Sequence, residues 1–521
     1  MSTTVRSPVI RRAVALLICV PLLALEACAS ARSPGGERAE PIATRRTTEP
    51  TLVPRDCGVG DLPVQVDCSW LTVPVNRHAR HGSTLRLAVA VVRSPVPNHA
   101  PDPVVFVEGG PGFDNLSVNL PRFALPGDVF LQSRDVVLFD QRGTGMSEPR
   151  LDCPEVDQAR VRELGEAQPF AAKLDARRQA VRQCRRRLEA QGVDLNRFNS
   201  EASAADLADL RVALGVRSWN LLARSYGSRL ALATMRAHPQ GIRSVVLDSA
   251  YPPTLGRLDR LPEAVRSAFA TLSKACTEEG ACRAGAPDLR ATVQSIVHRL
   301  DAAPFEGTAD LGPAVGTVPL VVTGAGAYAD LVAALANTGA IPALPSTITA
   351  LANGDTTALK QGANAVSLAN GTADGAFLSI ECADSAQREL TQRAKRLLAA
   401  PGQLGDLVLE LAEPYCHDWR VAPLPASFND AVKSDIPTLV LAGAFDPLTP
   451  PGYGRAVANT LTNATFVDFP ASSHGVLNLT GTAQPSDACV VAIVARFVVD
   501  PNGAVDTQCA KSATPRFAAG R

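Results

Sequence analysis

Short apolar runs bounded by turn residues alternate with amphipathic segments through the first half of the chain and return near its end. The runs are rich in Val, Leu and Ile, which predicts buried strands. Alternation of strand with helix predicts an α/β fold with a mostly parallel sheet flanked by helices. The predicted strands are 71–75, 85–92, 104–107, 136–139, 219–222, 245–247, 437–441 and 465–469, and the predicted helices around them are 171–190, 202–214, 228–238 and 488–498.

The alternation stops between residues 252 and 425. This stretch is rich in Ala and Leu at helical spacing, and glycine- and proline-rich connections separate its segments. An insertion of this kind before the last strands predicts a large, mainly helical cap over the sheet. Its predicted helices are 263–275, 289–300, 327–336 and 387–399.

The first residues have the pattern of an export signal. Three arginines precede an apolar stretch, 13–25, that is too short to span a bilayer comfortably. The tetrapeptide that ends at Cys28 resembles a bacterial lipoprotein signal, in which this thiol is lipidated. A twin-arginine signal and a single-span anchor are the alternatives. We therefore predict an exported protein that is either anchored in the cell envelope through Cys28 or secreted.

These patterns divide the chain into five parts. Residues 29–56 are rich in Arg, Pro, Thr, Ser and Glu, which is typical of a flexible tether. The predicted parts are a signal peptide at 1–28, the tether at 29–56, the first part of the core at 57–251, the cap at 252–425 and the last part of the core at 426–521.

Composition and charge limit the classes of function. Of the 521 residues, 46% are hydrophobic and 20% are charged, which is ordinary for a folded protein and argues against disorder along the whole chain. Lys and Arg together number 51, as do Asp and Glu, so the formal net charge is zero. Without an overall positive charge, the simplest argument for a nucleic-acid partner is missing, and none is predicted.

Ten cysteines remain after the signal, an even number in a chain predicted to be exported, so we expect disulfides. None of them forms a CxxC pair typical of structural zinc sites, and we predict neither a metal nor another cofactor. Neighbours paired in order would close five short loops. The predicted pairs are Cys57 with Cys68, Cys153 with Cys184, Cys276 with Cys282, Cys382 with Cys416, and Cys489 with Cys509.

The segment around Ser225 has the context of a nucleophile elbow. A predicted strand, the sequence ARSYG at 223–227 and a predicted helix follow one another directly. The sharp turn between strand and helix lifts the serine hydroxyl clear of the sheet. The usual pattern is GxSxG, and Ala223 stands in place of its first glycine. Ser225 is therefore the predicted nucleophile.

A serine hydroxyl needs a base to take its proton and an acid to orient that base. In this fold the chain order is serine, acid, histidine. Asp446 lies in the loop after strand 437–441, and His474 lies in the loop after strand 465–469. They are the predicted acid and base. Asp248, at the end of an earlier strand, is the rival acid.

An oxyanion hole needs two N–H donors that point at the developing negative charge. The amide of Tyr226, which follows the predicted nucleophile, is the first candidate. The second comes from the turn GGPG at 109–112, where Gly110 and Gly112 allow the backbone to approach a substrate closely. No lysine follows these glycines and their spacing differs from a P-loop or dinucleotide-binding motif.

These segments together resemble the prolyl and tripeptidyl aminopeptidase family of α/β hydrolases. The resemblance rests on GGPG at 109–112, DQRGTGMS at 140–147, SYG at 225–227, VLD at 246–248, DPLTP at 446–450 and SHG at 473–475. It is greatest to the secreted tripeptidyl aminopeptidases of actinobacteria and to the mycobacterial cell-envelope proteases. The resemblance implies an α/β-hydrolase fold and cleavage of short peptides from a free N-terminus, without a cofactor.

The resemblance also implies that carboxylates of the cap bind the ammonium group of the substrate, since a buried ammonium needs a charged partner. Glu381, Asp384 and Glu413 are the candidates in the predicted cap, and Glu108 beside the glycine turn is a further one. Two other functions remain open. The same machinery serves an esterase or amidase that acts on non-peptide acyl compounds. A non-catalytic surface lipoprotein that binds a ligand would fit the substitution at Ala223.

Overall fold

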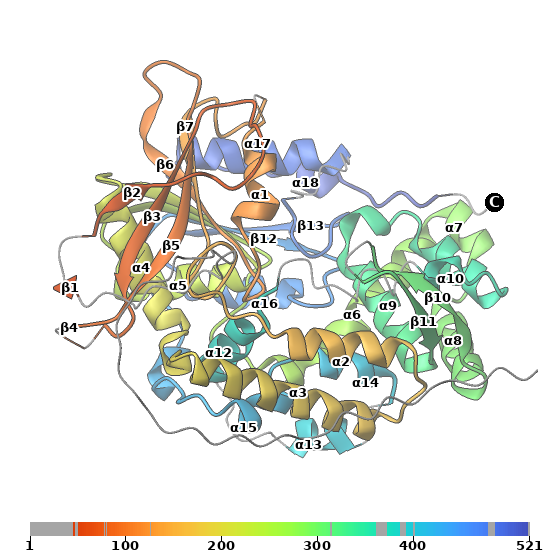
Figure 1. Cartoon of the computed structure of the whole chain (residues 1–521). Helices are drawn as coiled ribbons and strands as arrows, with labels where there is room; N and C mark the ends of the chain where they lie inside the picture. Colours follow the sequence, from red (N-terminus) through yellow and green to blue (C-terminus); the bar gives the residue numbers. More distant parts are fainter. Residues whose placement is uncertain are drawn as a thin grey trace, which may run out of the picture. The chain divides into compact units, whose positions relative to one another are not determined.

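A nine-stranded sheet forms the centre of the fold (Figure 1). This computed structural model describes residues 45–46, 50–77, 79, 81–125, 127–312, 315–360, 372–385, 392–399, 402–477 and 485–518. The strand order is β13-β12-β9-β8-β6-β7-β5-β3-β2. The bounds are β2 Leu52–Pro54, β3 Val66–Pro74, β5 Thr84–Val92, β6 Ala100–Val107, β7 Arg134–Phe139, β8 Trp219–Arg224, β9 Ile242–Asp248, β12 Thr438–Gly443 and β13 Ala464–Phe469.

The sheet has an antiparallel and a parallel half. Strands β2, β3, β5 and β7 pair antiparallel, whereas β7, β6, β8, β9, β12 and β13 pair parallel. The carboxyl ends of the parallel strands therefore meet at one edge, which is where open α/β sheets carry their sites. This arrangement confirms the predicted α/β fold.

Alternate side chains along the strands pack into two apolar layers, one on each side of the sheet. Val105 and Val107 of β6 join the layer with α4 and α5, whereas Val104 and Phe106 join the layer with α1 and α17. Both layers consist of almost fully buried side chains, so the sheet has no solvated face over its centre. The helices are α1 Leu116–Phe123, α4 Ser200–Ala213, α5 Tyr226–Ala237, α16 Pro451–Ala458, α17 Pro485–Val499 and α18 Gln508–Ser512.

The cap has an apolar core of its own, to which its helices and one β-hairpin contribute. The hairpin, β10 Phe305–Asp310 with β11 Thr317–Val322, departs from the helical prediction. Strand β10 has few apolar residues, and β11, although mostly apolar, contains Pro319. The described cap helices are α6 Arg257–Glu278, α7 Gly280–Gly285, α8 Leu289–Ala302, α9 Gly324–Ala336, α10 Leu344–Ala352, α12 Asp374–Asp384, α13 Gln392–Ala399, α14 Gly405–Leu409 and α15 Cys416–Trp419.

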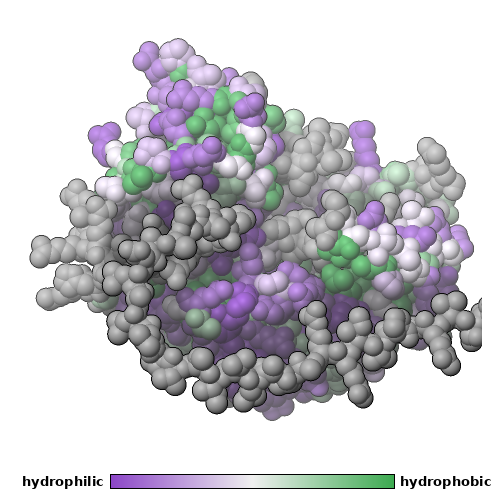
Figure 2. Space-filling model, in the orientation of Figure 1, coloured by the Kyte–Doolittle hydropathy of each residue, from purple (hydrophilic) through white to green (hydrophobic). Residues whose placement is uncertain are grey.

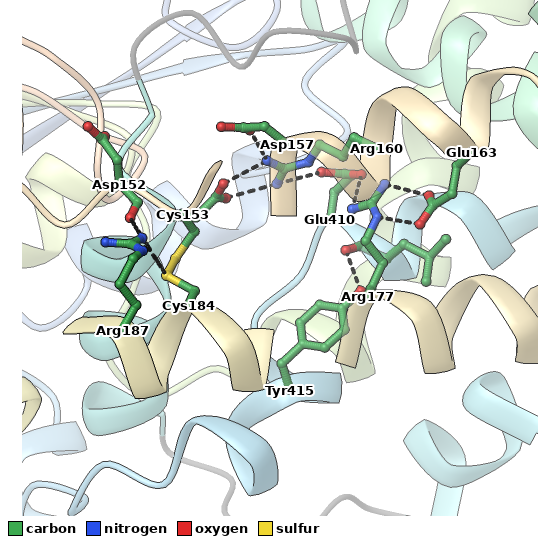
Figure 3. A network of polar contacts seen from close by, with 12 residues as sticks. Asp152, Cys153, Asp157, Arg160, Glu163, Arg177, Cys184, Arg187, Glu410 and Tyr415 are labelled. Carbon is green, nitrogen blue, oxygen red and sulfur yellow. Dashed lines mark hydrogen bonds and ion pairs between the residues drawn. A yellow bond between two sulfur atoms is a disulfide. The ribbon is translucent and has the colours of Figure 1, made fainter. Parts of the chain in front are cut away.

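Two helices inserted between β7 and α4 connect the core with the cap. They are α2 Pro154–Leu164 and α3 Phe170–Ala190, and their face in Figure 2 is mostly hydrophilic. Arg160 of α2 pairs with Asp374 of α12 through its two terminal guanidinium nitrogens, Nη1 at 2.7 Å and Nη2 at 2.9 Å. Glu410 receives one hydrogen bond from Arg160 and one from Arg177 (Figure 3). These buried and half-buried ion pairs fix the start of α12 against α2.

Five disulfides join the cysteines pairwise in sequence order, which confirms the predicted pairing. The longest loop, of 34 residues, is closed by Cys382 of α12 and Cys416 of α15. A second bridge, Cys153–Cys184, joins the start of α2 to α3 (Figure 3). Each such link stabilises the fold by about 2–4 kcal/mol, chiefly by restricting the unfolded chain.

The N-terminal predictions fall largely outside the described residues. This holds for the signal peptide, for Cys28 and for most of the tether. Within the part of the chain that the structure describes, no helix combines the length and apolarity needed to cross a bilayer.

Candidate active site

Ser225 lies in a sharp turn between β8 and α5. Its backbone angles are φ 55° and ψ −123°, a conformation that a side-chain-bearing residue rarely adopts. The turn is held because the Ser225 N–H donates to Asp248 O at 2.9 Å and the Ser228 hydroxyl donates to Ser225 O at 2.5 Å. Gly227 permits this turn, since a Cβ atom there would lie 2.1 Å from Val107 O. The local geometry is that of a nucleophile elbow.

The side chains of Ser225, His474 and Asp446 meet at the carboxyl edge of the sheet. His474 Nε2 lies 3.0 Å from Ser225 Oγ, and His474 Nδ1 lies 2.8 Å from Asp446 Oδ2. The three residues are supplied by the loops after β8, β12 and β13, which lie up to 249 positions apart in sequence. The structure therefore brings together the three residues predicted for a serine–histidine–aspartate arrangement.

Thr449 completes the hydrogen bonds around the acid and was not singled out from the sequence. Its hydroxyl lies 2.7 Å from Asp446 Oδ2 and 3.0 Å from His474 Nδ1, while the N–H groups of Leu448 and Thr449 both donate to Asp446 Oδ1 at 2.8 Å. Burial by itself raises the pKa of Asp446, but the His474 charge and these hydrogen bonds outweigh burial and lower it. Asp446 is thus ionised and oriented.

The rival acid, Asp248, has a different set of partners. Its carboxylate accepts the N–H groups of Val476 and Leu477 at 2.8 and 2.9 Å. It therefore holds the backbone that follows His474, and its hydrogen bonds do not reach the imidazole. Burial raises the pKa of Asp248 although these N–H donors lower it in part.

The loop of His474 is also fixed by the cap. His474 N–H donates to Ala336 O at 3.2 Å, at the end of α9. The hydroxyl of Ser473 donates to Leu335 O at 2.6 Å, and its N–H donates to the Thr338 hydroxyl at 2.8 Å. The imidazole thus has its backbone anchored on one side by the core and on the other by the cap.

The glycine turn lies directly beside the elbow. A Cβ atom on Gly109 would lie 2.9 Å from Ser225 Cβ, and Gly110 and Gly112 have φ values of 104° and 96°. The carbonyl of Gly112 accepts the N–H of Ala373 at 2.9 Å, next to the start of α12. Only glycine fits such close and positive-φ positions. The turn and the amide of Tyr226 therefore lie close to the same hydroxyl.

Two of the predicted carboxylates of the cap, Glu381 of α12 and Glu413, lie close to Arg257 and to each other. Glu381 receives a hydrogen bond from Arg257 at 3.3 Å, and Glu413 Oε1 receives one from the N–H of Leu258 at 3.3 Å. Glu413 Oε2 is buried and has no hydrogen-bond partner in the part of the chain that the structure describes. Burial raises the pKa of Glu413, and the charge of Glu381 raises it further. Two carboxylates thus share one guanidinium in a buried cluster.

The other two predicted acids are occupied by the protein itself. Asp384 contacts the Ser200 hydroxyl and accepts a hydrogen bond from the Ser200 backbone N–H at 3.2 Å. The Ser200 hydroxyl also lies 2.5 Å from the phenol oxygen of Tyr226. Glu108 is paired with Arg224. All four of these carboxylate oxygens already have partners within the protein.

Family models match two separate stretches of the chain. Residues 102–274 match a model described as the alpha/beta hydrolase fold, and residues 404–509 match one described as TAP-like protein. The serine protease Hip1 of Mycobacterium tuberculosis is 25% identical over 467 residues, which cover 84% of this chain and 86% of that protein. The chain belongs to the aminopeptidase-like family of α/β hydrolases.

A tripeptidyl aminopeptidase and a solved structure also resemble the chain. The tripeptidyl aminopeptidase of Streptomyces coelicolor is 28% identical over 231 residues, or 42% of each chain. Among solved structures, the proline iminopeptidase of Mycobacterium smegmatis covers 83% of this chain and 98% of its own, with 16% identity and a TM-score of 0.38. The fold and the relatives named serine protease and tripeptidyl aminopeptidase make the protein a serine hydrolase of the peptidase type.

One prediction concerns Asp384 beneath the elbow of this hydrolase. Burial raises the pKa of Asp384 to about 6, although Arg229 and Ser200 lower it in part. Because this folded-state pKa exceeds the ordinary unfolded value, the stability that Asp384 contributes is present below about pH 4 and is lost as pH rises through 6. Relative to Asp384→Asn, the wild-type unfolding free energy should fall by up to about 3 kcal/mol from pH 4 to pH 7.

Denaturant unfolding of both proteins at several pH values measures this difference. The exposed Asp435→Asn variant serves as the control and should give a difference that stays flat. A flat difference for Asp384→Asn as well would contradict the raised pKa.

Proposed function

We propose that this serine hydrolase is an aminopeptidase that releases short peptides from free N-termini, with Ser225 as nucleophile, His474 as general base and Asp446 as orienting acid. The observation that carries the proposal is the continuous contact of hydroxyl, imidazole and carboxylate at 3.0 and 2.8 Å. Two of the relatives, the tripeptidyl aminopeptidase and a proline iminopeptidase of Xylella fastidiosa, carry names of this activity.

The proposed reaction is acyl transfer. Ser225 Oγ attacks the peptide carbonyl carbon while His474 Nε2 takes the hydroxyl proton, and the same nitrogen then gives that proton to the leaving amine. Water next attacks the acyl-enzyme, losing its proton to His474, and the serine hydroxyl is restored. The backbone amides of Tyr226 and of the turn at Gly110 and Gly112 stabilise the oxyanion in both steps of the reaction, acylation and deacylation.

The buried acidic cluster supports recognition of the substrate ammonium. Glu381 and Glu413 lie close to the guanidinium of Arg257, Arg229 also interacts with Glu381, and Glu413 Oε2 has no hydrogen-bond partner among the described residues. A chain of contacts connects the cluster to the elbow: Ser228 accepts the N–H of Tyr251 at 2.8 Å, and Arg257 lies over the ring of Tyr251 at 5.8 Å. A cationic substrate terminus would satisfy this buried negative charge.

Short peptides with free and N-acetylated termini test the proposed substrate class. We expect hydrolysis of the free peptides and loss of activity on acetylation, because the acetyl group removes the positive charge. Activity that is confined to short acyl esters would instead identify an esterase.

Glu413→Gln tests the amine site itself. The variant should raise KM for a free peptide by about 10- to 100-fold, since truncating a buried charge pair costs several kcal/mol. Turnover of a short acyl ester, which has no ammonium group, should stay within about twofold. The matched control is the exposed Glu278→Gln on α6, which should change neither value. Equal effects of Glu413→Gln on both substrates would contradict an amine site.

We also propose that the protein is exported and is attached to the cell envelope through a lipid on Cys28. Five disulfides support an oxidising compartment, because such bonds are rare in the cytosol. Detergent partitioning of the wild type and of Cys28→Ala tests the attachment. The wild type should enter the detergent phase and the variant should not.

A further inference from the structure

Arg224 lies next to three segments of the proposed active site: the elbow at Ser225, the glycine turn and the loop of His474. Its backbone directly precedes Ser225, and its guanidinium contacts Glu108, which directly precedes the glycine turn. Its side chain also passes close to the loop of His474, because a Cβ atom on Gly475 would lie 3.3 Å from Arg224 Cδ. One side chain therefore touches the elbow, the glycine turn and the histidine loop.

The contact with Glu108 is a two-point ion pair. Arg224 Nη2 lies 2.6 Å from Glu108 Oε2, and Arg224 Nε lies 3.2 Å from Glu108 Oε1. The carboxylate has two more donors, the N–H of Gly109 at 2.6 Å and the Asn119 amide at 2.7 Å. Glu108 is buried, and it thereby fixes the first amide of the glycine turn as well as the guanidinium.

The pair lies one position beyond the last paired residues of β6 and β8. Strands β6 and β8 pair in parallel register up to Val107 and Ala223, so Glu108 and Arg224 are the next two residues of the same register. Among the described residues, the ladder between β6 and β8 ends at Val107 and Ala223. The side-chain pair therefore bridges the two segments that carry the proposed oxyanion donors.

We propose that the Glu108–Arg224 ion pair is a positioning pair that sets the separation between the two halves of the oxyanion hole. The inference rests on the proposed roles of Ser225 and of the glycine turn. Donors of an oxyanion hole act only when they are held within a few tenths of an ångström of the developing charge. A bidentate arginine–carboxylate pair supplies that rigidity, because its planar geometry fixes direction as well as distance.

The surroundings keep this guanidinium charged. Burial by itself would lower the pKa of Arg224, but the negative charges of Glu108 and Asp248 outweigh burial and raise it. Removing the charge of Glu108 would leave a partly buried cation next to the nucleophile, with Asp248 engaged by the histidine loop. The guanidinium would then move, and the glycine turn would lose its anchor.

A double-mutant cycle tests the pair with Glu108→Gln, Arg224→Gln and the double variant, assayed on a short acyl ester so that the amine site is not involved. Each single variant should lower kcat by about 10- to 100-fold, because misplacing an oxyanion donor acts on the transition state, while KM changes less than about threefold. The double variant should lose less than the product of the two single losses. Arg224→Lys, which keeps one charged contact, should lie between Arg224→Gln and the wild type.

Affinity for a phenylboronic acid gives a second readout. This inhibitor forms a tetrahedral adduct with the serine oxygen, and its affinity should fall in parallel with kcat. The matched control is Asp102→Asn, which removes the partner of Arg134 near the opposite end of β6. It should lower the melting temperature yet leave kcat within about twofold.

Two results would overturn the proposal in distinguishable ways. If Glu108→Gln and Arg224→Gln lower only the melting temperature, as the control does, the pair is structural and does not position the hole. If Ser225→Ala, assayed alongside, keeps its ester activity, the proposed nucleophile itself is wrong and there is no oxyanion hole at this place to position.

Discussion

Ser225→Ala and His474→Ala should each lower turnover of a peptide substrate by about 10⁴- to 10⁶-fold, because hydroxyl and imidazole act as one unit. The alanine at 225 leaves no oxygen to form the acyl-enzyme, and the alanine at 474 leaves no base within reach of Ser225 Oγ. The double variant should be scarcely slower than either single one, since the remaining rate comes from binding and the oxyanion donors alone.

Initial rates and labelling by a fluorophosphonate probe measure these effects. The probe should label the wild type and leave Ser225→Ala unlabelled, a result that would also exclude a protein that only binds ligands. His238→Ala, at the end of the helix that starts at the elbow, is the control and should keep full activity. A loss below about tenfold for either variant would remove that residue from its proposed role.

Gly227→Ala should destabilise the fold and abolish activity together. The added methyl would lie 2.1 Å from Val107 O and 3.0 Å from Glu108 O, which are backbone atoms that cannot rotate away. Either α5 or the end of β6 must shift, and overpacking of this kind costs about 3 kcal/mol or more. The same shift would displace Ser225 and the glycine turn relative to each other.

Gly452→Ala is the matched control for this substitution. Gly452 is also the second residue of a helix, α16, but nothing lies within 4 Å of a Cβ atom at that position. Since alanine favours helix, we expect a gain in unfolding free energy of up to about 1 kcal/mol. Thermal unfolding of the two variants decides the matter: equal melting temperatures would show that the elbow tolerates a methyl group.

The sequence allowed the fold and the placement of the three central residues to be predicted because each has a local signal. Ser225 lies between a clear strand and a clear helix, and Asp446 and His474 follow apolar strands near the end of the chain. Parallel strands bring such ends to one edge whatever the distance along the chain. The sequence alone does not determine disulfide connectivity, and pairing neighbours in order was one choice among many; the five bridges follow it.

The contacts of the individual acids could not be predicted in this way. Glu381 and Asp384 are three residues apart on α12, yet one pairs with Arg257 and the other with Ser200. Those partners come from distant elements, and α12 itself has no strong helical pattern in the sequence. Thr449 was missed for a related reason, because a hydroxyl near an aspartate has no signal until the histidine is placed beside both.

The anchoring of the histidine loop on α9 limits how substrates can enter. Ala336 and Leu335 accept hydrogen bonds from the loop, and Thr338 accepts a third. Because these hydrogen bonds hold the His474 loop to the end of α9, moving the whole cap away would also move His474 away from Ser225. A substrate entrance that keeps the proposed contact between Ser225 and His474 must therefore open away from α9.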